Sequence, residues 1–284
     1  MKIKDFHPKE IIRRFKNRPP VVGAIRLSGV IAAHSGPARH ALNLAQMEDV
    51  IEEAFELSRL KAVALLVNSP GGSPVQSALL HDRIRALAAE KEVPVYVFCE
   101  DVAASGGYWI ACAGDEIYAN ENSIVGSIGV IAASFGFEEM IAKLGVERRV
   151  HTAGKRKSFL DPFVPENKED VERLLDLQRQ IHETFKSHVK SRRGDKLSDD
   201  DEDLFSGDFW TAREAQKRGL IDDLGDSRQV LREKFGDKVK IREIEAKKGW
   251  LQRRMNFGAD TRSDLVEQFV ATLNSRSLWQ RFGL

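Results

Sequence analysis

Apolar runs alternate with segments of helical periodicity along most of the chain. Apolar side chains within 43–59 recur every three or four residues, which predicts an amphipathic helix, and the same spacing predicts another over 75–90. The uninterrupted apolar runs 62–67 and 93–99 are typical of buried strands. Because strand and helix alternate, we expect parallel strands joined by right-handed crossovers, and therefore an α/β fold with a single catalytic domain.

The same reasoning divides the chain into three parts. We expect a basic N-terminal arm over 1–20, one domain over 21–245 and a basic, amphipathic C-terminal tail over 246–284. The further elements expected in the domain are strands over 21–27, 115–119, 146–152 and 238–244, and helices over 108–113, 137–144, 167–189, 211–218 and up to residue 235.

Composition narrows the class of protein. The chain has 284 residues, of which 42% are hydrophobic and 31% charged, enough to bury a real core. No run approaches the roughly 18 apolar residues of a membrane span, and the N-terminus lacks the apolar core of a secretory signal, so we expect a cytoplasmic protein. Cys99 and Cys112 lie in apolar runs without metal-ligand spacing and are expected to be buried, reduced thiols. The acidic run 199–203 is interpreted as solvated surface, and no metal or cofactor is expected.

The net charge of +1 hides an uneven distribution. Residues 1–20 hold seven Lys and Arg against two acidic residues, and residues 246–284 hold seven against three, so the middle of the chain is acidic. An acidic body argues against a nucleic-acid enzyme. Basic ends with interleaved aromatic residues predict peripheral contact with the inner face of an anionic membrane; the alternative is that the tail packs on a neighbouring subunit.

Ser105 is the first candidate for chemistry. It stands between the strand ending at Cys99 and the expected helix from Tyr108 to Ala113, so it lies at a helix N-terminus, where unpaired N–H groups favour negative charge. Gly106 has no Cβ, which leaves its N–H free to face a substrate carbonyl. We interpret Ser105 as a nucleophile. The alternative is a serine that caps the helix beside closely packed glycines.

A second loop is expected to face Ser105. The strand over 62–67 runs into Asn68-Ser-Pro-Gly-Gly72, and loops at the carboxyl ends of parallel strands build the site in open α/β sheets. A backbone N–H from this loop and that of Gly106 would form an oxyanion hole. The alternative is an ordinary Pro-Gly turn.

The order and spacing of these motifs resemble the signal peptide peptidase A family of serine/lysine peptidases. That family shares the Clp protease/crotonase-like fold of repeated β-β-α/β-α units. The resemblance covers about 21–235, with Ala212 where the family usually has glycine. The motifs that carry it are Asn68-Ser-Pro-Gly-Gly72, Ala104-Ser-Gly-Gly-Tyr-Trp109, Gly126-Ser-Ile-Gly-Val130, Lys157-Ser-Phe-Leu-Asp-Pro-Phe163, Trp210-Thr-Ala-Arg-Glu-Ala215 and Gly219-Leu-Ile-Asp-Asp-Leu-Gly225.

The resemblance implies a role for each site residue. Ser105 would be the nucleophile, Lys157 the general base, Ser127 the hydroxyl that holds the lysine, and Gly72 and Gly106 the oxyanion donors. The implied activity is hydrolysis of short or unfolded apolar peptides, such as signal-peptide remnants, through an acyl-enzyme. The implied assembly is a homo-oligomer, for which we expect an octamer.

A lysine serves as a base only when it is neutral. Its ordinary pKa is about 10.4, and burial lowers that value. We expect Phe159, Leu160 and Phe163 to supply the apolar wall around Lys157. Lys155 competes for the role.

Histidine offers a different base. A Ser-His-Asp triad would use His151 or His81 instead, although neither lies in a matched motif.

Two other functions suit the same fold. A crotonase-type acyl-CoA hydratase or isomerase would use the same oxyanion hole, but it needs a carboxylate base that the sequence does not single out. A non-catalytic membrane-associated scaffold would have no need for Ser105, Ser127 and Lys157.

Overall fold

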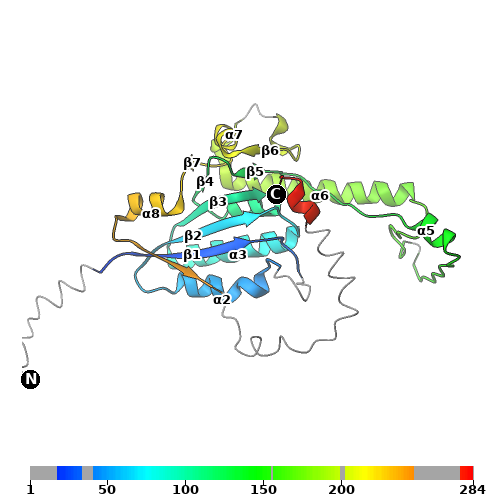
Figure 1. Ribbon diagram of the computed structural model, residues 1–284, viewed down its shortest axis with the longest axis horizontal. Coiled ribbons are helices and arrows are strands. Elements are labelled where there is room, and N and C mark those ends of the chain that lie inside the picture. The colour runs from blue at the N-terminus through cyan, green and yellow to red at the C-terminus, as the bar shows by residue number, and fades with distance from the viewer. Residues whose placement is uncertain (1–17, 34–40, 155, 199–201, 246–275, 284) are drawn as a thin grey trace, which may run out of the picture.

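The computed structural model describes residues 18–33, 41–154, 156–198, 202–245 and 276–283. A central sheet is accompanied by helices, and one long helix, α6, runs from the sheet toward α5 at the opposite end of the molecule (Figure 1). Strands and helices alternate along most of the chain, which confirms the expected α/β class.

The sheet is almost wholly parallel. Its main path follows the order β6-β5-β3-β2-β1-β8, and β4 pairs with both β3 and β7. Among the pairings of described strands, β5 with β6 is antiparallel and the others are parallel. The strands are β1 (Val21–Ser28), β2 (Leu60–Ser69), β3 (Val95–Ala104), β4 (Glu116–Ala119), β5 (Ile124–Gly126), β6 (Phe209–Thr211), β7 (Asp223–Leu224) and β8 (Lys240–Ile244).

Polar side chains start several of the helices. Asn43, Ser73 and Asn167 each accept a hydrogen bond from an N–H in the first turn of α2, α3 and α6. The helices are α2 (Leu44–Phe55), α3 (Pro74–Lys91), α4 (Gly106–Ala111), α5 (Glu138–Lys143), α6 (Lys168–Arg193), α7 (Ala212–Lys217) and α8 (Ser227–Phe235), with short 3₁₀ turns η1 (Gly194–Lys196) and η2 (Glu202–Phe205).

Both faces of the sheet are covered by apolar side chains. On β1, Ile25 belongs to a large cluster with residues of α2, α3, α4 and α6, whereas Ala24 belongs to a smaller one with Leu231 of α8. Successive strand residues point to opposite faces, so a strand buried on both sides is a continuous apolar run. This is why β2 and β3 were recognisable from sequence.

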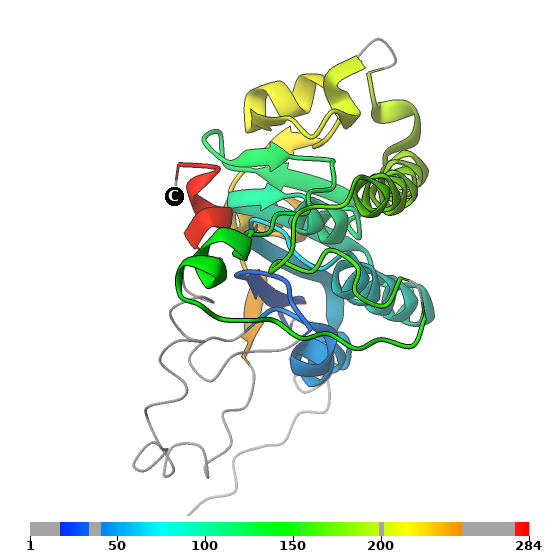
Figure 2. The ribbon, with the colours of Figure 1, turned by 90° about the vertical axis from the view of Figure 1, so that its right-hand side faces the viewer.

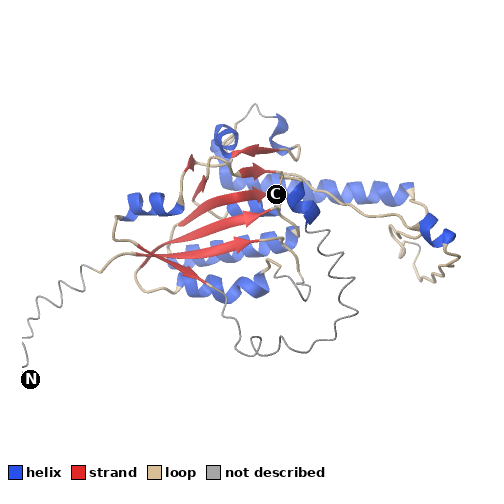
Figure 3. Ribbon diagram, viewed as in Figure 1, coloured by secondary structure: helices blue, strands red, loops and turns tan. Residues whose placement is uncertain are grey.

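Several expected elements differ from those observed. The strand expected over 146–152 is wrong, because that segment is irregular, and Val146 and Val150 are 55% and 44% exposed. Figure 3 shows loops on both sides of α5, beyond the sheet, where no neighbouring strand is available for pairing. The helix expected to reach Arg59 ends at Phe55, and the helix expected from Tyr108 begins at Gly106.

Residues 131–154 and 156–181 form an extension that we call the projection. It comprises the loops around α5 and the first half of α6, and it lies in front of the sheet in the turned view (Figure 2). The buried side chains of α6 are Phe185, Val189 and Arg193, all in its second half. At 1.5 Å per residue, the 26 residues of α6 span about 39 Å, so its first half reaches well past the body.

The C-terminal tail contacts the sheet where it is described. The ring of Phe282 lies 5.0 Å from the ring of Phe209 in β6, in an edge-to-face arrangement. Residues 1–17 of the basic arm and 246–275 of the tail lie outside the described residues.

Candidate active site

Ser105 occupies the junction between β3 and α4. Its backbone has a φ of 52°, a conformation that costs energy for a residue other than glycine and is typical of functional turns. The Ser105 N–H donates to the carbonyl of Gly126 at 2.8 Å, and the Ser105 carbonyl accepts from the N–H of Trp109 at 3.0 Å. The side chain makes no capping hydrogen bond. The hydroxyl is therefore not used to start the helix, and the simple capping interpretation is wrong.

The loop after β2 lies directly against Ser105. A Cβ placed on Gly71 would lie 2.7 Å from the Ser105 Cβ and 2.8 Å from the Gly106 nitrogen, closer than atoms can approach. A Cβ on Gly106 would lie 3.3 Å from the nitrogen of Gly72. The expectation that the two glycine loops face each other is confirmed, and glycine is required because any side chain would push them apart.

The N–H of Gly72 is not used to bind Ile31. Ile31 donates its N–H to the carbonyl of Gly71 at 2.9 Å and accepts from the N–H of Ser73 at 2.8 Å. In a parallel bridge the flanking residues make the hydrogen bonds, so the N–H of Gly72 itself points away from Ile31. This orientation suits a donor to a bound oxyanion.

Ser127 lies beside Ser105 at the carboxyl edge of the sheet. Ala104 of β3 is paired in register with Gly126 of β5, so the two serines are the residues that follow a matched pair. Adjacent strands lie about 4.8 Å apart. Ser127 is 4% exposed, has a φ of 52°, and donates its N–H to the carbonyl of Asp208 at 2.6 Å. The structure therefore brings Ser105, Ser127 and both glycine loops together.

Lys157 is exposed on the projection, away from this cluster. Its loop is held at the start of α6, where the N–H of Leu160 donates to Asp170 at 3.3 Å. Asp170 precedes His182 by twelve residues, or about 18 Å along the helix, and it is His182 that contacts the site. Among the described residues, no hydrogen bond joins Lys157 to Ser105.

The apolar wall expected around Lys157 is not formed within one chain. Phe159, Leu160 and Phe163 are half-buried, whereas Lys157 is exposed, so the expectation that they bury it is wrong for the single chain. The ring of Phe163 instead lies 5.7 Å from that of Phe137, elsewhere in the projection. Lys155, the competing base, lies outside the described residues.

The histidines proposed for a triad do not reach Ser105. His81 is buried, with Nδ1 2.8 Å from the carboxylate of Asp82 and its ring 4.4 Å from that of His188. His151 is exposed on the projection. No histidine ring hydrogen-bonds Ser105 in the part of the chain that the structure describes, so the geometry does not favour a Ser-His-Asp triad.

The two cysteines are free, buried thiols, as expected. Burial raises the pKa of both Cys99 and Cys112 to about 12, which keeps them protonated and poorly nucleophilic. Within the described ranges, no group of three or more His, Cys, Asp and Glu residues is arranged to hold a metal ion.

Sequence reasoning missed two side chains that contact the site. His182 places Nε2 3.0 Å from the carbonyl of Ile128, next to Ser127, and His188 places Nε2 3.2 Å from the carbonyl of Trp109. The only sequence signal was the presence of two histidines within the helix expected over 167–189.

None of the helices in the described ranges has the length and apolar character needed to cross a lipid bilayer.

Comparison with known proteins assigns the chain to a family. The model for "Peptidase family S49" matches residues 88–241, a range that contains Ser105, Ser127 and Lys157.

Individual relatives are similar over parts of their length. A Brucella abortus protein named Na(+)/H(+) antiporter NhaA is 50% identical over 283 residues, covering 96% of this chain and 38% of that protein. The chloroplastic serine protease SPPA of Arabidopsis thaliana is 32% identical over 211 residues, covering 72% of this chain and 30% of that protein. Protease 4 of Haemophilus influenzae is 33% identical over 183 residues, covering 62% and 28%.

The chain thus spans well under half the length of these relatives, and the antiporter name describes the whole Brucella protein. The family model, by contrast, covers more than half of this chain and includes the strand, the helix and the turn that carry the two serines. On that evidence the chain belongs to peptidase family S49.

Proposed function

We propose that the chain is a serine endopeptidase that cleaves short or unfolded apolar peptides through an acyl-enzyme on Ser105. The observation that carries this proposal is the uncapped hydroxyl of Ser105, held in a left-handed conformation against the glycine loop after β2. At the N-terminus of α4, the N–H of Gly106 and the N–H of Gly72 would stabilise the oxygen of an attacked carbonyl as it becomes negative.

The proposed reaction has two stages. Neutral Lys157 takes the proton of Ser105, whose oxygen attacks the peptide carbonyl, while the N–H groups of Gly72 and Gly106 stabilise the oxyanion. The amine product leaves with a proton from the lysine. Water, activated by the same lysine, then hydrolyses the ester, with the hydroxyl of Ser127 holding the amine in place.

We propose that Lys157 reaches a serine in an oligomer. In one chain its loop lies at the far end of α6, and its side chain is exposed. The projection that carries it also holds ten of the fourteen exposed large apolar side chains among the described residues. Packing this surface on another copy would exclude water from Lys157, which its neutral form requires, and would bring it to that copy's Ser105.

A fluorophosphonate that reacts with activated serines tests the proposal directly. We expect wild-type protein to be labelled, Ser105→Ala and Lys157→Ala to lose labelling and peptide cleavage, and Ser127→Ala to be weakened less. Lys143→Ala, which removes another exposed lysine of the projection, is the matched control and should retain activity.

The same experiment separates the alternatives. Near wild-type activity in Lys157→Ala, with loss in Lys155→Ala or His151→Ala, would overturn the assignment of the base. A folded wild-type protein that is not labelled at all would instead favour the acyl-CoA hydratase or the non-catalytic scaffold. Mixing Ser105→Ala with Lys157→Ala subunits should restore activity, because one intact serine and one intact lysine then meet between copies.

A further inference from the structure

Helix α6 contacts both serine-bearing segments through histidine side chains. The Nε2 of His182 lies 3.0 Å from the carbonyl oxygen of Ile128, and the Nε2 of His188 lies 3.2 Å from that of Trp109. The two histidines are six residues apart, about 9 Å along the helix. A single rigid element thus touches the turn after Ser127 and the helix after Ser105.

The turn that carries Ser127 is held by its backbone hydrogen bonds, by burial and by His182. Ser127 adopts a φ of 52°, its N–H is bound by Asp208 and its carbonyl accepts from the N–H of Gly129 at 2.9 Å. Ile128 follows directly and is fully buried. The hydrogen bond from His182 adds a restraint on the peptide group between Ile128 and Gly129, one peptide removed from Ser127 in the same turn.

The helix that follows Ser105 depends on tertiary contacts for its position. Helix α4 has six residues, far fewer than an isolated helix needs for stability in water. Trp109 donates its N–H to the carbonyl of Ser105, accepts from His188 through its own carbonyl, and stacks its ring on His188 with centroids 4.6 Å apart. A single residue, Trp109, thus links His188 to the backbone of Ser105.

The carbonyl partners fix the position of one hydrogen on each histidine ring. A carbonyl oxygen only accepts hydrogen bonds, so each Nε2 must carry a hydrogen. Burial, with His81 nearby, lowers the pKa of His188 to about 4, so this ring is neutral near pH 7 and donates from Nε2. Its ring also lies edge-on to His81, which is held by Asp82.

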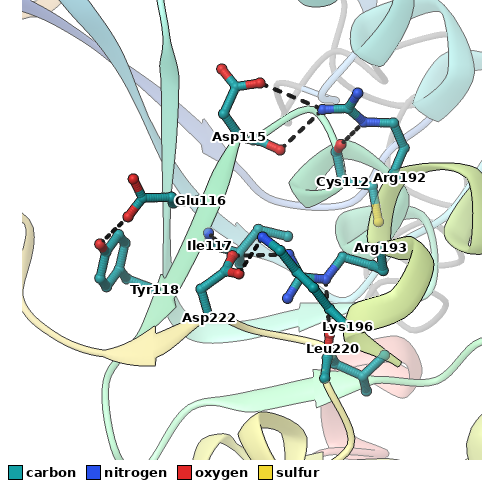
Figure 4. A network of polar contacts seen from close by, with 12 residues as sticks. Cys112, Asp115, Glu116, Ile117, Tyr118, Arg192, Arg193, Lys196, Leu220 and Asp222 are labelled. Carbon is teal, nitrogen blue, oxygen red and sulfur yellow. Dashed lines mark hydrogen bonds and ion pairs between the residues drawn. The ribbon is translucent and has the colours of Figure 1, made fainter. Parts of the chain in front are cut away.

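The C-terminal end of α6 is locked to the body, which keeps these donors in register. Arg193 is 2% exposed and donates to Asp222 at 2.9 Å and to the carbonyl of Gly219 at 2.9 Å, while Arg192 donates to the carbonyl of Cys112 at 2.8 Å (Figure 4). Cys112 is the C-cap residue directly after α4. Sliding α6 along its axis would break these contacts together with those of the histidines.

We propose that His182 and His188 are positioning residues that hold the Ser127 turn and the Ser105 helix in register with each other through α6. Neither ring touches the reacting atoms. The inference rests on the proposed peptidase function for its effect on activity, but its effect on the two segments is independent of that function.

Matched substitutions separate hydrogen bonding from packing. His188→Gln keeps an N–H donor, whereas His188→Phe keeps a ring that stacks on Trp109 but has no donor. His182→Gln and His182→Leu form the corresponding pair. Thr184→Ala is the control on the same helix, since the Thr184 hydroxyl donates within α6, to the carbonyl of Gln180.

We expect His188→Phe and His182→Leu to lower kcat and the rate of fluorophosphonate labelling by roughly tenfold to a hundredfold, because small displacements of reacting groups are costly. KM should change little, and the two glutamine variants should retain most activity. Phe and Leu variants that react like wild type would overturn the proposal, as would Gln variants that lose as much as their partners.

Hydrogen–deuterium exchange supplies a readout that does not require activity. We expect faster amide exchange in 105–112 for His188→Phe and in 126–130 for His182→Leu, with no change in Thr184→Ala. Unchanged exchange in those segments would overturn the positioning roles even in an inactive protein. A wild-type protein that fails to react with the probe, but whose variants show these exchange changes, would refute the peptidase function and support the positioning roles.

Discussion

Ser105 and Ser127 share an unusual backbone conformation, with φ of 52° at each. Left-handed conformations cost of order 1–3 kcal/mol for side chains with a Cβ and persist where the surroundings enforce them. Here both residues leave neighbouring parallel strands at matched positions, and each N–H is bound, by Gly126 and Asp208 respectively. The strain therefore turns two hydroxyl-bearing residues out of the sheet at the same edge.

The glycine at position 72 provides a test at the scale of one residue. A Cβ there would lie 2.0 Å from the carbonyl oxygen of Ile31, and the φ of 143° is unfavourable for any other residue. We expect Gly72→Ala to displace the loop and its N–H, and to lower kcat by on the order of 10²–10³, the loss measured when one oxyanion donor is removed. Steady-state peptide cleavage measures this.

Gly236→Ala is the matched control for backbone strain. Gly236 also has a positive φ, 85°, but a Cβ there would meet no atom within 4 Å. Loss of stability with normal kcat is expected for this control. An equal fall in kcat for both variants would show that Gly72 acts through stability and not through its N–H.

At the scale of elements, α6 gives the protein a predictable response to acid. Burial is the largest cause that lowers the pKa of His188 to about 4, and the pKa of His81 is lowered for the same first reason. In the unfolded chain these histidines have the ordinary histidine pKa of about 6.5 and bind protons there, whereas in the folded chain they do not. The contribution of these histidines to the stability of the folded state should therefore be complete above about pH 6.5. It should be lost progressively as the pH falls from 6.5 toward 4.

Denaturant unfolding at pH 7 and pH 5 measures this effect. We expect the wild type to lose more stability over that interval than His188→Gln, which has no titrating ring. An identical pH dependence in the two proteins would contradict it. The charges of Asp82 and Arg192 also act on the pKa of His188, so both residues should be left unchanged in the two proteins compared.

The elements that could be predicted are those with a signal in their own residues. The apolar runs of β2 and β3 and the spacing of α2 and α3 all lie in contiguous sequence. Strands β5, β6 and β7 have two or three residues each, too few for any periodicity. Their existence depends on neighbours distant in sequence, such as the pairing of Gly126 with Phe209.

The candidate site divides in the same way. Ser105 and the glycine loops were recognisable because strand ends and a helix start are local features, and parallel strands bring their carboxyl ends to one edge. The exposure of Lys157 could not be predicted, because the burial of its side chain depends on the path that the projection takes beyond the sheet. The histidines of α6 were missed for a related reason: a hydrogen bond to a backbone carbonyl leaves no mark on the sequence that accepts it.

At the scale of the whole molecule, the projection predicts self-association. Phe135 is 74% exposed, Leu144 69% and Ile131 65%, and such side chains are rarely left in water together. We expect an oligomer, with an octamer as the expected size, at micromolar concentration by light scattering. Phe135→Asp with Leu144→Asp should shift it to smaller species and lower cleavage. An active monomeric wild type would contradict this prediction.

The basic ends carry a second prediction at this scale. Residues 1–20 and 246–284 each hold seven Lys and Arg, and each such residue near an anionic surface contributes about 1 kcal/mol. We expect the full chain to co-sediment with vesicles that contain anionic lipid, and a chain truncated after Glu245 to bind more weakly. Binding that ignores the anionic lipid content, or that survives loss of both basic ends, would refute it.

The two buried thiols can report which part of the fold opens first. Cys112 follows the last residue of α4, and its carbonyl accepts a hydrogen bond from Arg192. Cys99 lies in the middle of the sheet, and burial raises the pKa of each thiol to about 12. Alkylating reagents attack thiolates, so in the closed fold neither sulfur should react. Modification of Cys112 before Cys99 would mark the parting of α6 from α4, and simultaneous modification would mark the opening of the whole sheet. The order in which two sulfur atoms become alkylated thus measures whether the long helix can lift away alone.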